Sequence, residues 1–359
     1  MATIVLAGGG TAGHIEPALA VARLWRETHS ADTIVFIGTK SGLENKLVPS
    51  AGFTLAHIPK VSISRTPSQS WLHVPTDLFH AVSAARLVLK EADLLIGFGG
   101  YVSAPAYLAA RMAGIPMLIH EANAKPGWAN RLGALMTPYL AVAHLVDSRE
   151  FRGARITGLP LRSDVADAFE QSRGDFRAAR IAAKRRLGFD ESAPLVFIMG
   201  GSQGSVAINN AVAGAIESLS DRGISILHSL GRGNSLPKAT ATYHPVAYID
   251  QMADAYLASD LIIARSGAVT CSEFRALGRY ALFVPLPIGN GEQFFNARNL
   301  LADGRAEIIE QRSFNAAYLN AHIDDLLRSS AKSPMDGSDI DLNAAAKILS
   351  YGEFAMSQR

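Results

Sequence analysis

The chain contains one local plan twice: a β-rich run, a cluster of glycines and a helix-period segment. TIVLAGGGTAGHIEPALAVARLW begins at Thr3, and LVFIMGGSQGSVAINNAVAGAI begins at Leu195. A strand that leads through a glycine turn into a helix is typical of the first βαβ unit of a parallel sheet. Two such starts in 359 residues predict two doubly wound α/β domains rather than one large sheet.

Strand-like segments and helix-period segments alternate along both halves of the sequence. We predict a domain boundary within ITGLPLR, so that residues 1–162 form one domain and residues 163–341 the other. The charged stretch 163–190 should pack on the second domain, residues 329–341 should form a loop, and a final helix at about 342–357 should return to the first domain. The expected strands are 3–7, 33–37, 94–97, 117–120, 139–142, 195–199, 225–229, 261–264 and 281–285, and the expected helices are 17–28, 77–90, 104–113 and 206–219.

Composition narrows the class of protein. Apolar residues make up 48% of the chain and charged residues 18%, as in globular proteins. The single cysteine, Cys271, excludes an intramolecular disulfide and favours a reducing compartment. We find no apolar run of membrane-spanning length and no signal-peptide core before Thr3, so we expect a soluble, cytoplasmic protein.

The charge is distributed unevenly. Residues 1–162 hold 15 Lys and Arg against 10 Asp and Glu, a net +5, whereas the remainder holds 19 against 22, a net −3. Ordinary surface variation explains this as well as an anionic ligand or an acidic lipid face near the first half does. Dense basic runs with interleaved aromatics are absent from the sequence, so no nucleic-acid partner is expected.

The first glycine cluster, Gly8 to Gly13, suits a phosphate. Glycines let backbone amides approach a ligand closely, and the following helix start carries a partial positive charge. The spacing matches a dinucleotide fingerprint, but that fingerprint needs a carboxylate after the second strand, where Thr39 and Lys40 stand. His14 follows directly, either as a hydrogen-bonding group at the helix start or as a general base.

A second glycine turn, 97–101, and the segment HEANAKPGWANR follow later strands of the first half. Two glycine turns side by side would cradle two phosphates. Glu121, Asn123 and Asn130 stand after a strand, where polar side chains contact ligands, although Asn also serves plain turn geometry.

The second half places its candidate residues after three strands. The turn 200–204 lacks the Lys-Ser/Thr of a Walker loop, so we expect it to hold a diphosphate through its amides and Ser202 rather than to hydrolyse ATP. In RSGAVTCSE, Arg265 would pair with phosphate, and Glu273 would accept ribose hydroxyls or simply complement the helix dipole. Gln293 and Asn296 have amides suited to sugar hydroxyls. Asp339 and Asp341 lie away from every strand end, so no metal site and no cofactor are expected.

Together these motifs resemble the MurG family, bacterial enzymes that transfer N-acetylglucosamine from its UDP ester to a lipid-linked muramyl pentapeptide. The segments that carry the resemblance span roughly residues 8–297 and include GGGTAGH, GFGGYVSAP, HEANAKPGWANR, ITGLPLR, GGSQG and YIDQMADAYLASDLIIARSGAVTCSE. The resemblance implies the GT-B fold, in which two Rossmann-like domains face each other across a cleft. It also implies an inverting transfer to the C4 hydroxyl of lipid I, giving lipid II for peptidoglycan, without a covalent intermediate.

The resemblance also assigns site residues. His14 would be the catalytic base, and no metal would take part. The acceptor diphosphate would meet Gly10, Gly99, Gly100 and Tyr101. UDP-N-acetylglucosamine would contact Thr11, Ala12, Gly13, Asn123, Arg162, Ser202, Ile249, Arg265, Ala268, Val269, Thr270, Cys271, Ser272, Glu273, Gln293 and Asn296.

Two positions depart from the family pattern. Ala12 stands where the family usually has a second glycine, so a negative φ is required there. Glu292 occupies a place often filled by glutamine, which puts its sugar contact in doubt.

A lipid-linked substrate at a membrane would explain the net positive charge of residues 1–162. The segment Trp-Leu-His-Val at 71–74, with Leu78 and Phe79, forms a largely apolar patch near Arg65, Arg86 and Lys90 in the sequence. Such a patch is typical of peripheral contact with the cytoplasmic face of the bacterial plasma membrane. A helix that faces the core is the alternative reading. Other cell-wall synthesis proteins are further candidate partners. Two other function classes remain open at this point, a UDP-sugar epimerase on the same fold and a nucleotide-sugar-binding protein without catalysis.

Overall fold

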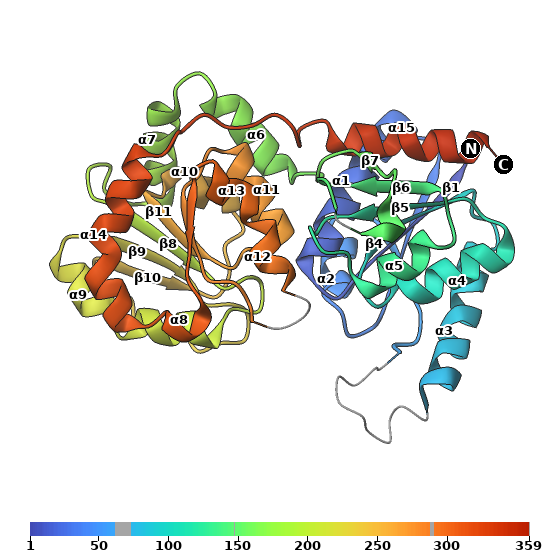
Figure 1. Ribbon diagram of the computed structural model, residues 1–359, viewed down its shortest axis with the longest axis horizontal. Helices are drawn as coiled ribbons and strands as arrows, with labels where there is room; N and C mark the ends of the chain where they lie inside the picture. The colour runs from blue at the N-terminus through green and yellow to red at the C-terminus, as the bar shows by residue number, and fades with distance from the viewer. Residues whose placement is uncertain (62–72, 147, 288–290, 359) are drawn as a thin grey trace. The chain divides into compact units, whose positions relative to one another are not determined.

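Two parallel sheets organise the chain, one in each of two units (Figure 1). The computed structural model describes residues 1–61, 73–146, 148–287 and 291–358. The first unit comprises Met1–Arg162 and Ile340–Arg359, and the second comprises Ser163–Asp339. The last helix of the chain therefore belongs to the unit that contains the first strand.

The first unit is built around β1. Among the described residues its sheet has seven parallel strands in the order β3-β2-β1-β4-β5-β6-β7. The strands are β1 Thr3–Gly8, β2 Thr33–Gly38, β3 Thr54–His57, β4 Leu94–Gly99, β5 Met117–Glu121, β6 Tyr139–Val142 and β7 Arg155–Ile156. The helices are α1 Ala12–Thr28, α2 Glu44–Ser50, α3 Val74–Leu89, α4 Ser103–Ala113, α5 Trp128–Ala134, η2 Arg149–Phe151 and α15 Ala344–Ser357.

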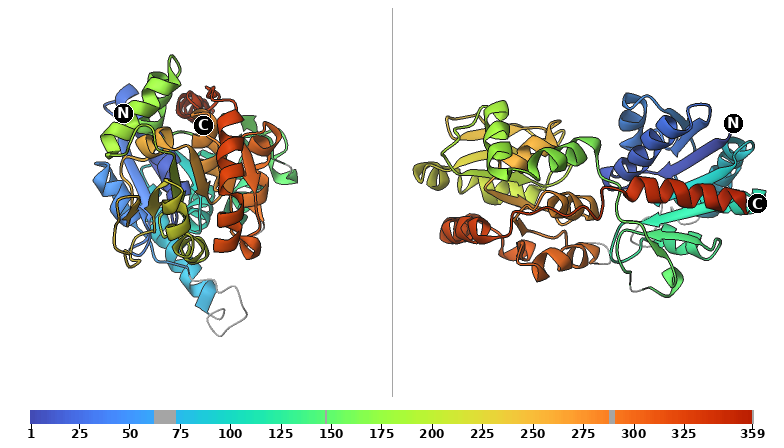
Figure 2. Two further views of the ribbon diagram at one scale, coloured as in Figure 1. Left: turned by 90° about the vertical axis from the view of Figure 1, so that its left-hand side faces the viewer. Right: turned by 90° about the horizontal axis from the view of Figure 1, so that it is seen from above.

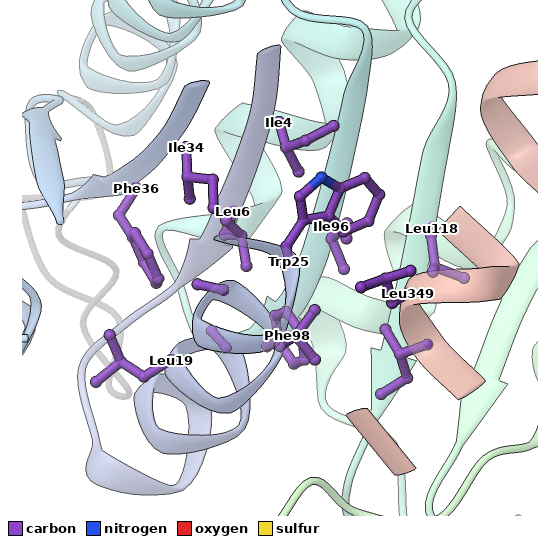
Figure 3. Close-up of a cluster of buried hydrophobic side chains, with 14 of the residues drawn as sticks. Ile4, Leu6, Leu19, Trp25, Ile34, Phe36, Ile96, Phe98, Leu118 and Leu349 are labelled. Atoms are coloured by element: carbon purple, nitrogen blue, oxygen red, sulfur yellow. The ribbon is translucent and has the colours of Figure 1, made fainter. Parts of the chain in front are cut away.

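Strand residues of this sheet alternate between two cores, as the pleat requires. Ile4 and Leu6 pack with Trp25 of α1 and Leu349 of α15 on one face (Figure 3). Val5 and Ala7 pack against α3 and α4 on the other face. The views in Figure 2 also place α15, the last red helix, along this first sheet. Both faces are thus covered, which explains why the strands are almost wholly apolar.

The second unit repeats the plan. Among the described residues its sheet has six parallel strands in the order β10-β9-β8-β11-β12-β13, and α8, α9 and α14 share an apolar core with one face. The strands are β8 Leu195–Met199, β9 Ser225–Ser229, β10 Tyr243–Val246, β11 Leu261–Ala264, β12 Ala281–Phe283 and β13 Ala306–Ile308. The helices are α6 Ser163–Ser172, α7 Phe176–Leu187, α8 Val206–Ala213, α9 Ile216–Asp221, α10 Met252–Ala258, α11 Ala268–Ala276, α12 Glu292–Asn296, α13 Arg298–Ala302, η3 Gln311–Ser313 and α14 Ala316–Lys332.

Two expectations about helices are wrong. The single helix predicted over 206–219 is divided into α8 and α9 around Gly214. A Cβ at Gly214 would lie 2.9 Å from Cβ of Ala316, so the glycine admits the close approach of α14. The loop predicted from residue 329 starts later, because α14 continues to Lys332 with Ser330 buried and hydrogen-bonded to the Asp260 carbonyl.

Candidate functional site

In the first unit, two glycine loops meet at the carboxyl ends of β1 and β4. These strands are paired, with Gly8 opposite Gly99, and the Gly9 amide donates to the Gly99 carbonyl at 3.4 Å. Gly10, Gly99 and Gly100 all have positive φ, between 84° and 93°. A Cβ at Gly100 would overlap the Gly9 carbonyl oxygen, so this close approach of the two loops requires glycine at position 100. The structure therefore brings the predicted acceptor-side residues together.

Helix α1 begins directly after the first loop. Thr11 is its exposed N-cap residue and makes no side-chain cap hydrogen bond within the described structure. Amides of a first helical turn lack intrahelical partners, so this end suits an anion. Positive φ among the described residues is confined to glycines, which confirms the negative φ required of Ala12. Gly13 is half-buried in the same turn.

His14 is held by the first loop. Its Nδ1 lies 3.1 Å from the Gly9 carbonyl oxygen and 3.2 Å from Oγ1 of Thr11. The carbonyl can only accept, so in this arrangement Nδ1 carries the hydrogen and Nε2 keeps its lone pair. Burial lowers the pKa of His14 below 6.5, although nearby Glu121 and Glu44 and the Gly9 hydrogen bond partly oppose this. The ring is therefore a neutral imidazole at neutral pH, as a general base must be.

The segment after β5 is organised by Glu121, which is 2% exposed. Its carboxylate accepts from the backbone and side-chain nitrogens of Asn123, at 2.8 and 3.0 Å, and from Gly127 N and Asn130 Nδ2, both at 3.0 Å. Asn130 is buried as well and also accepts from the hydroxyl of Tyr107 at 2.7 Å. Glu121 and Asn130 thus shape the loop, whereas Asn123 is half-buried and lies closer to solvent. Arg162, half-buried, ends the first segment of this unit.

In the second unit, the loop 200–204 lies between β8 and α8. Gly201 and Gly204 have positive φ, and a Cβ at Gly204 would overlap the Leu230 carbonyl oxygen, so glycine is required there. Ser202 is half-buried on the loop. Ser205 caps α8 by accepting from Ile208 N at 3.4 Å. Ile249, on the connection from β10 to α10, is 7% exposed.

Arg265 makes protein contacts that the sequence did not predict. Its guanidinium donates to the carbonyls of Val284 and Pro285, to Ser205 Oγ and to Gln311 Oε1, at 2.6–3.1 Å. All four acceptors are uncharged, so the cation is hydrogen-bonded but not neutralised. Burial lowers the pKa of Arg265, yet a guanidinium keeps its charge at neutral pH. Arg265 therefore joins the segments that follow β11 and β12 to the start of α8 and to Gln311.

Helix α11 divides the RSGAVTCSE segment into two parts. Ala268, Val269 and Thr270 form its half-buried first turn, whereas Cys271, Ser272 and Glu273 are at most 7% exposed. Burial raises the pKa of the Cys271 thiol, which argues against a nucleophilic role. The buried hydroxyl of Ser266, just before the helix, makes no hydrogen bond within the described structure.

The carboxylate of Glu273 is oriented by Tyr256, whose hydroxyl donates to Oε2 at 2.8 Å. Both side chains are buried, at 3% and 2% exposure. Sequence reasoning did not identify Tyr256 or Glu44. The contacts of Tyr256 with Glu273 and of Glu44 with Gly10 form only in the folded chain, and a carboxylate within a glycine-rich stretch was the only available signal for Glu44.

Helix α12 contacts the RSGAVTCSE segment, which contains Ser266. Asn296 is 7% exposed and donates from Nδ2 to the Ser266 carbonyl at 3.3 Å, while Gln293 is half-buried and accepts from Leu286 N at 3.0 Å. Both amides are thus hydrogen-bonded to the protein. Glu292 begins the helix and is half-buried.

The aspartates near the C-terminus serve the fold. Asp341 is 1% exposed and accepts from Leu159 N at 3.0 Å, which attaches the final segment to ITGLPLR within the first unit. Among the described residues, no group of His, Cys, Asp or Glu has a geometry that could hold a metal ion.

The predicted membrane patch falls partly outside the described residues, since 62–72 are not among them, so Arg65, Trp71 and Leu72 are not located. Val74 and Leu78 pack against the core beneath α3, so for these two the reading as a surface patch is wrong. Phe79 and Leu87 lie on the opposite side of α3 and are 68% and 78% exposed.

Comparison with known proteins agrees with this architecture. Residues 4–142 match the glycosyltransferase family 28 N-terminal domain, and residues 195–350 match the glycosyltransferase family 28 C-terminal domain. A Corynebacterium glutamicum UDP-N-acetylglucosamine–N-acetylmuramyl-(pentapeptide) pyrophosphoryl-undecaprenol N-acetylglucosamine transferase is 44% identical over 335 residues, which cover 92% of this chain and 91% of that protein.

Two solved structures are informative. That of Acinetobacter baumannii MurG has a TM-score of 0.70 and 26% identity, and the match covers 99% of this chain and 100% of that one. A UDP-GlcNAc 2-epimerase from Neisseria meningitidis has a TM-score of 0.58 at 14% identity, covering 98% and 99%, which shows a shared fold only.

Proposed function

This chain belongs to glycosyltransferase family 28, and we propose that it transfers N-acetylglucosamine from UDP-N-acetylglucosamine to the C4 hydroxyl of lipid I, giving lipid II. It is a glycosyltransferase, and the expected GT-B fold is confirmed by its two parallel α/β units and by the MurG structure. The observation that carries the substrate assignment is the 44% identity, over 92% of the chain, with a transferase named for this reaction.

The donor site is proposed at the carboxyl ends of β8, β11 and β12. First-turn amides of α11, at Ala268 to Thr270, and Ser202 would hold the diphosphate, with the charge of Arg265 behind them. Glu273 would accept ribose hydroxyls, and the backbone of Ile249 would meet the uracil. Gln293 and Asn296 would contact the sugar through their side-chain amides. The burial of Cys271 and Ser272 favours backbone roles for these two.

The acceptor would bind at the paired glycine loops of the first unit. Amides of Gly10, Gly99 and Gly100 would meet its diphosphate, and Thr11 to Gly13, with Asn123 and Arg162, would approach the donor. Nε2 of His14 would take the C4 hydroxyl proton as that oxygen forms a bond to C1 of N-acetylglucosamine. The C1–phosphate bond breaks on the opposite face, so UDP leaves and the configuration inverts. A neutral imidazole and a buried thiol support this direct displacement.

The reaction can be tested with labelled UDP-N-acetylglucosamine and a short-chain lipid acceptor analogue. We expect label in a lipid-linked disaccharide and one UDP released for each disaccharide formed. Free N-acetylglucosamine with UDP would indicate hydrolysis only, and an epimerised UDP-sugar would indicate the alternative enzyme class. Binding of UDP-N-acetylglucosamine without any conversion would indicate a non-catalytic binding protein.

The outer side of α3 is our candidate for contact with the cytoplasmic membrane face. Within the described residues, no helix has both the length and the apolarity needed to cross a bilayer. Phe79 and Leu87 project away from the core beside exposed Arg86 and Lys90, a combination that suits the boundary of an anionic bilayer. Peripheral attachment would place the loops near a lipid-linked acceptor, and other cell-wall synthesis proteins would be neighbours there.

Replacing both Phe79 and Leu87 with serine should weaken binding to anionic vesicles at least about tenfold, because each large apolar side chain contributes roughly 1.5–3 kcal/mol when buried. Cosedimentation with phosphatidylglycerol vesicles measures the change. Leu236→Ser, at a 51% exposed leucine of the second unit, is the matched control and should bind as wild type. Equal binding by all three proteins would exclude this surface.

A further inference from the structure

Glu44 is a fully buried carboxylate that the mechanism above does not use. It begins α2, is 0% exposed, and receives three hydrogen bonds in the described part of the chain. Gly10 N donates to Oε2 at 3.0 Å, and Thr39 N and Thr39 Oγ1 donate to Oε1 at 3.0 and 3.2 Å. All three donors are uncharged. Burying a carboxylate in this way is costly, so its geometry is demanding.

Three glycines make room for this carboxylate. A Cβ at Gly42 would overlap both carboxylate oxygens, and one at Gly9 would lie 3.0 Å from Oε1. A Cβ at Gly38 would lie 2.5 Å from Cγ of Glu44. The ends of β1 and β2 and the start of α2 therefore close around one side chain. This accounts for glycines that neither strand pairing nor a positive φ requires.

The hydrogen-bond directions extend the network to Tyr101. Thr39 Oγ1 donates its hydrogen to the carboxylate of Glu44. It therefore accepts from the Tyr101 hydroxyl, which lies 3.2 Å away. The Tyr101 ring lies against Gly10 from the other side, where a Cβ would be 3.1 Å from Cε1. Gly10 is thus fixed between the carboxylate of Glu44 and the ring of Tyr101. The hydroxyl of Tyr101 has no hydrogen left for a phosphate, which favours contact through its backbone or ring.

We propose that Glu44 is a positioning residue for the acceptor: through Gly10 and the Thr39–Tyr101 pair it holds the first glycine loop in its acceptor-binding form. This proposal rests on the proposed function, because it assumes that the loop meets the acceptor. The loop also carries the Gly9 carbonyl that orients His14, so a displaced loop would misplace the base as well. The proposed uracil, ribose and diphosphate contacts at β8, β11 and β12 lie in the other unit and should not respond.

Steady-state kinetics of Glu44→Gln would test the proposal. A glutamine keeps the size but places an NH₂ group against N–H donors, so the loop should lose its anchor. We expect kcat/KM for the lipid acceptor analogue to fall roughly 10- to 100-fold, because a charge-assisted hydrogen bond is lost. The calorimetric Kd for UDP should stay within about twofold, since the proposed contacts of UDP lie in the second unit.

A matched pair at Thr39 separates the hydroxyl from the side-chain volume. Thr39→Val keeps the shape but removes the link to Tyr101, and it should lower acceptor kcat/KM about three- to tenfold. Thr39→Ser keeps the link and should retain nearly wild-type values. The losses in acceptor kcat/KM from Thr39→Val and Tyr101→Phe should be less than additive in the double variant, because both substitutions remove the same hydrogen bond between residues 39 and 101.

The controls distinguish three results. Glu27→Gln, at an exposed carboxylate of α1, should behave as wild type. If wild type forms no lipid product, the proposed function itself fails. If wild type is active but Glu44→Gln keeps the wild-type acceptor KM and kcat, or loses donor and acceptor affinity equally with a lower Tm, the positioning role is refuted.

Discussion

Replacing His14 with alanine should lower kcat by about 10²- to 10⁴-fold, the usual contribution of a positioned general base. The variant removes the only group in our scheme that takes the acceptor proton, while the donor contacts remain. The Kd for UDP-N-acetylglucosamine, measured by calorimetry, should therefore be unchanged. Thr11→Val removes a hydrogen bond to Nδ1 but leaves the Gly9 carbonyl to hold the ring, so its kcat should fall far less than that of His14→Ala. A wild-type rate in His14→Ala would remove His14 from the mechanism.

The same assignment predicts the pH dependence. Only neutral His14 can accept a proton, so kcat/KM for the acceptor should rise with pH through the pKa of His14 and then level off. Burial lowers that pKa from 6.5, so the acidic limb should lie below pH 6.5 and activity should be full at neutral pH. The buried carboxylates of Glu121 and Glu44 limit the shift. An acidic limb that persists in His14→Ala would show that another group titrates.

The sequence predicted most interior strands because their signal is local. Runs of β-branched and aliphatic residues that end in glycine mark β1, β2, β4 and β8 in any context. The missed strands lie at sheet edges: β3 and β10 contain polar residues, and β7 and β13 are only two and three residues long. Such strands depend on pairing with a neighbour, which a single sequence does not reveal.

For the site, as for the strands, only the features that depend on local sequence were predictable. Residue types at strand ends indicated phosphate and sugar chemistry, but not which polar groups the protein itself occupies. Arg265 is the clearest example, since its four partners come from three separate segments of the chain. Glu44 and Tyr256 show the reverse case, because their contacts with Gly10 and Glu273 arise only from tertiary packing.

Replacing Glu273 with glutamine should lower kcat/KM for UDP-N-acetylglucosamine roughly 100-fold. An ionised carboxylate that accepts ribose hydroxyls contributes about 1.5–3 kcal/mol per hydrogen bond, and the amide can accept only on one side. The acceptor KM should not change. Tyr256→Phe should give a smaller loss in the same direction, because the carboxylate remains but loses the hydroxyl that orients Oε2.

A modified donor decides whether Glu273 acts on the ribose. Wild type should discriminate strongly against the 2′-deoxy analogue of UDP-N-acetylglucosamine, since the missing hydroxyl removes a proposed hydrogen bond to a buried carboxylate. Glu273→Gln should discriminate far less, because its loss and that of the hydroxyl remove the same interaction. Equal discrimination by both proteins would leave Glu273 with the alternative role of complementing the dipole of α11, which affects stability and not donor choice.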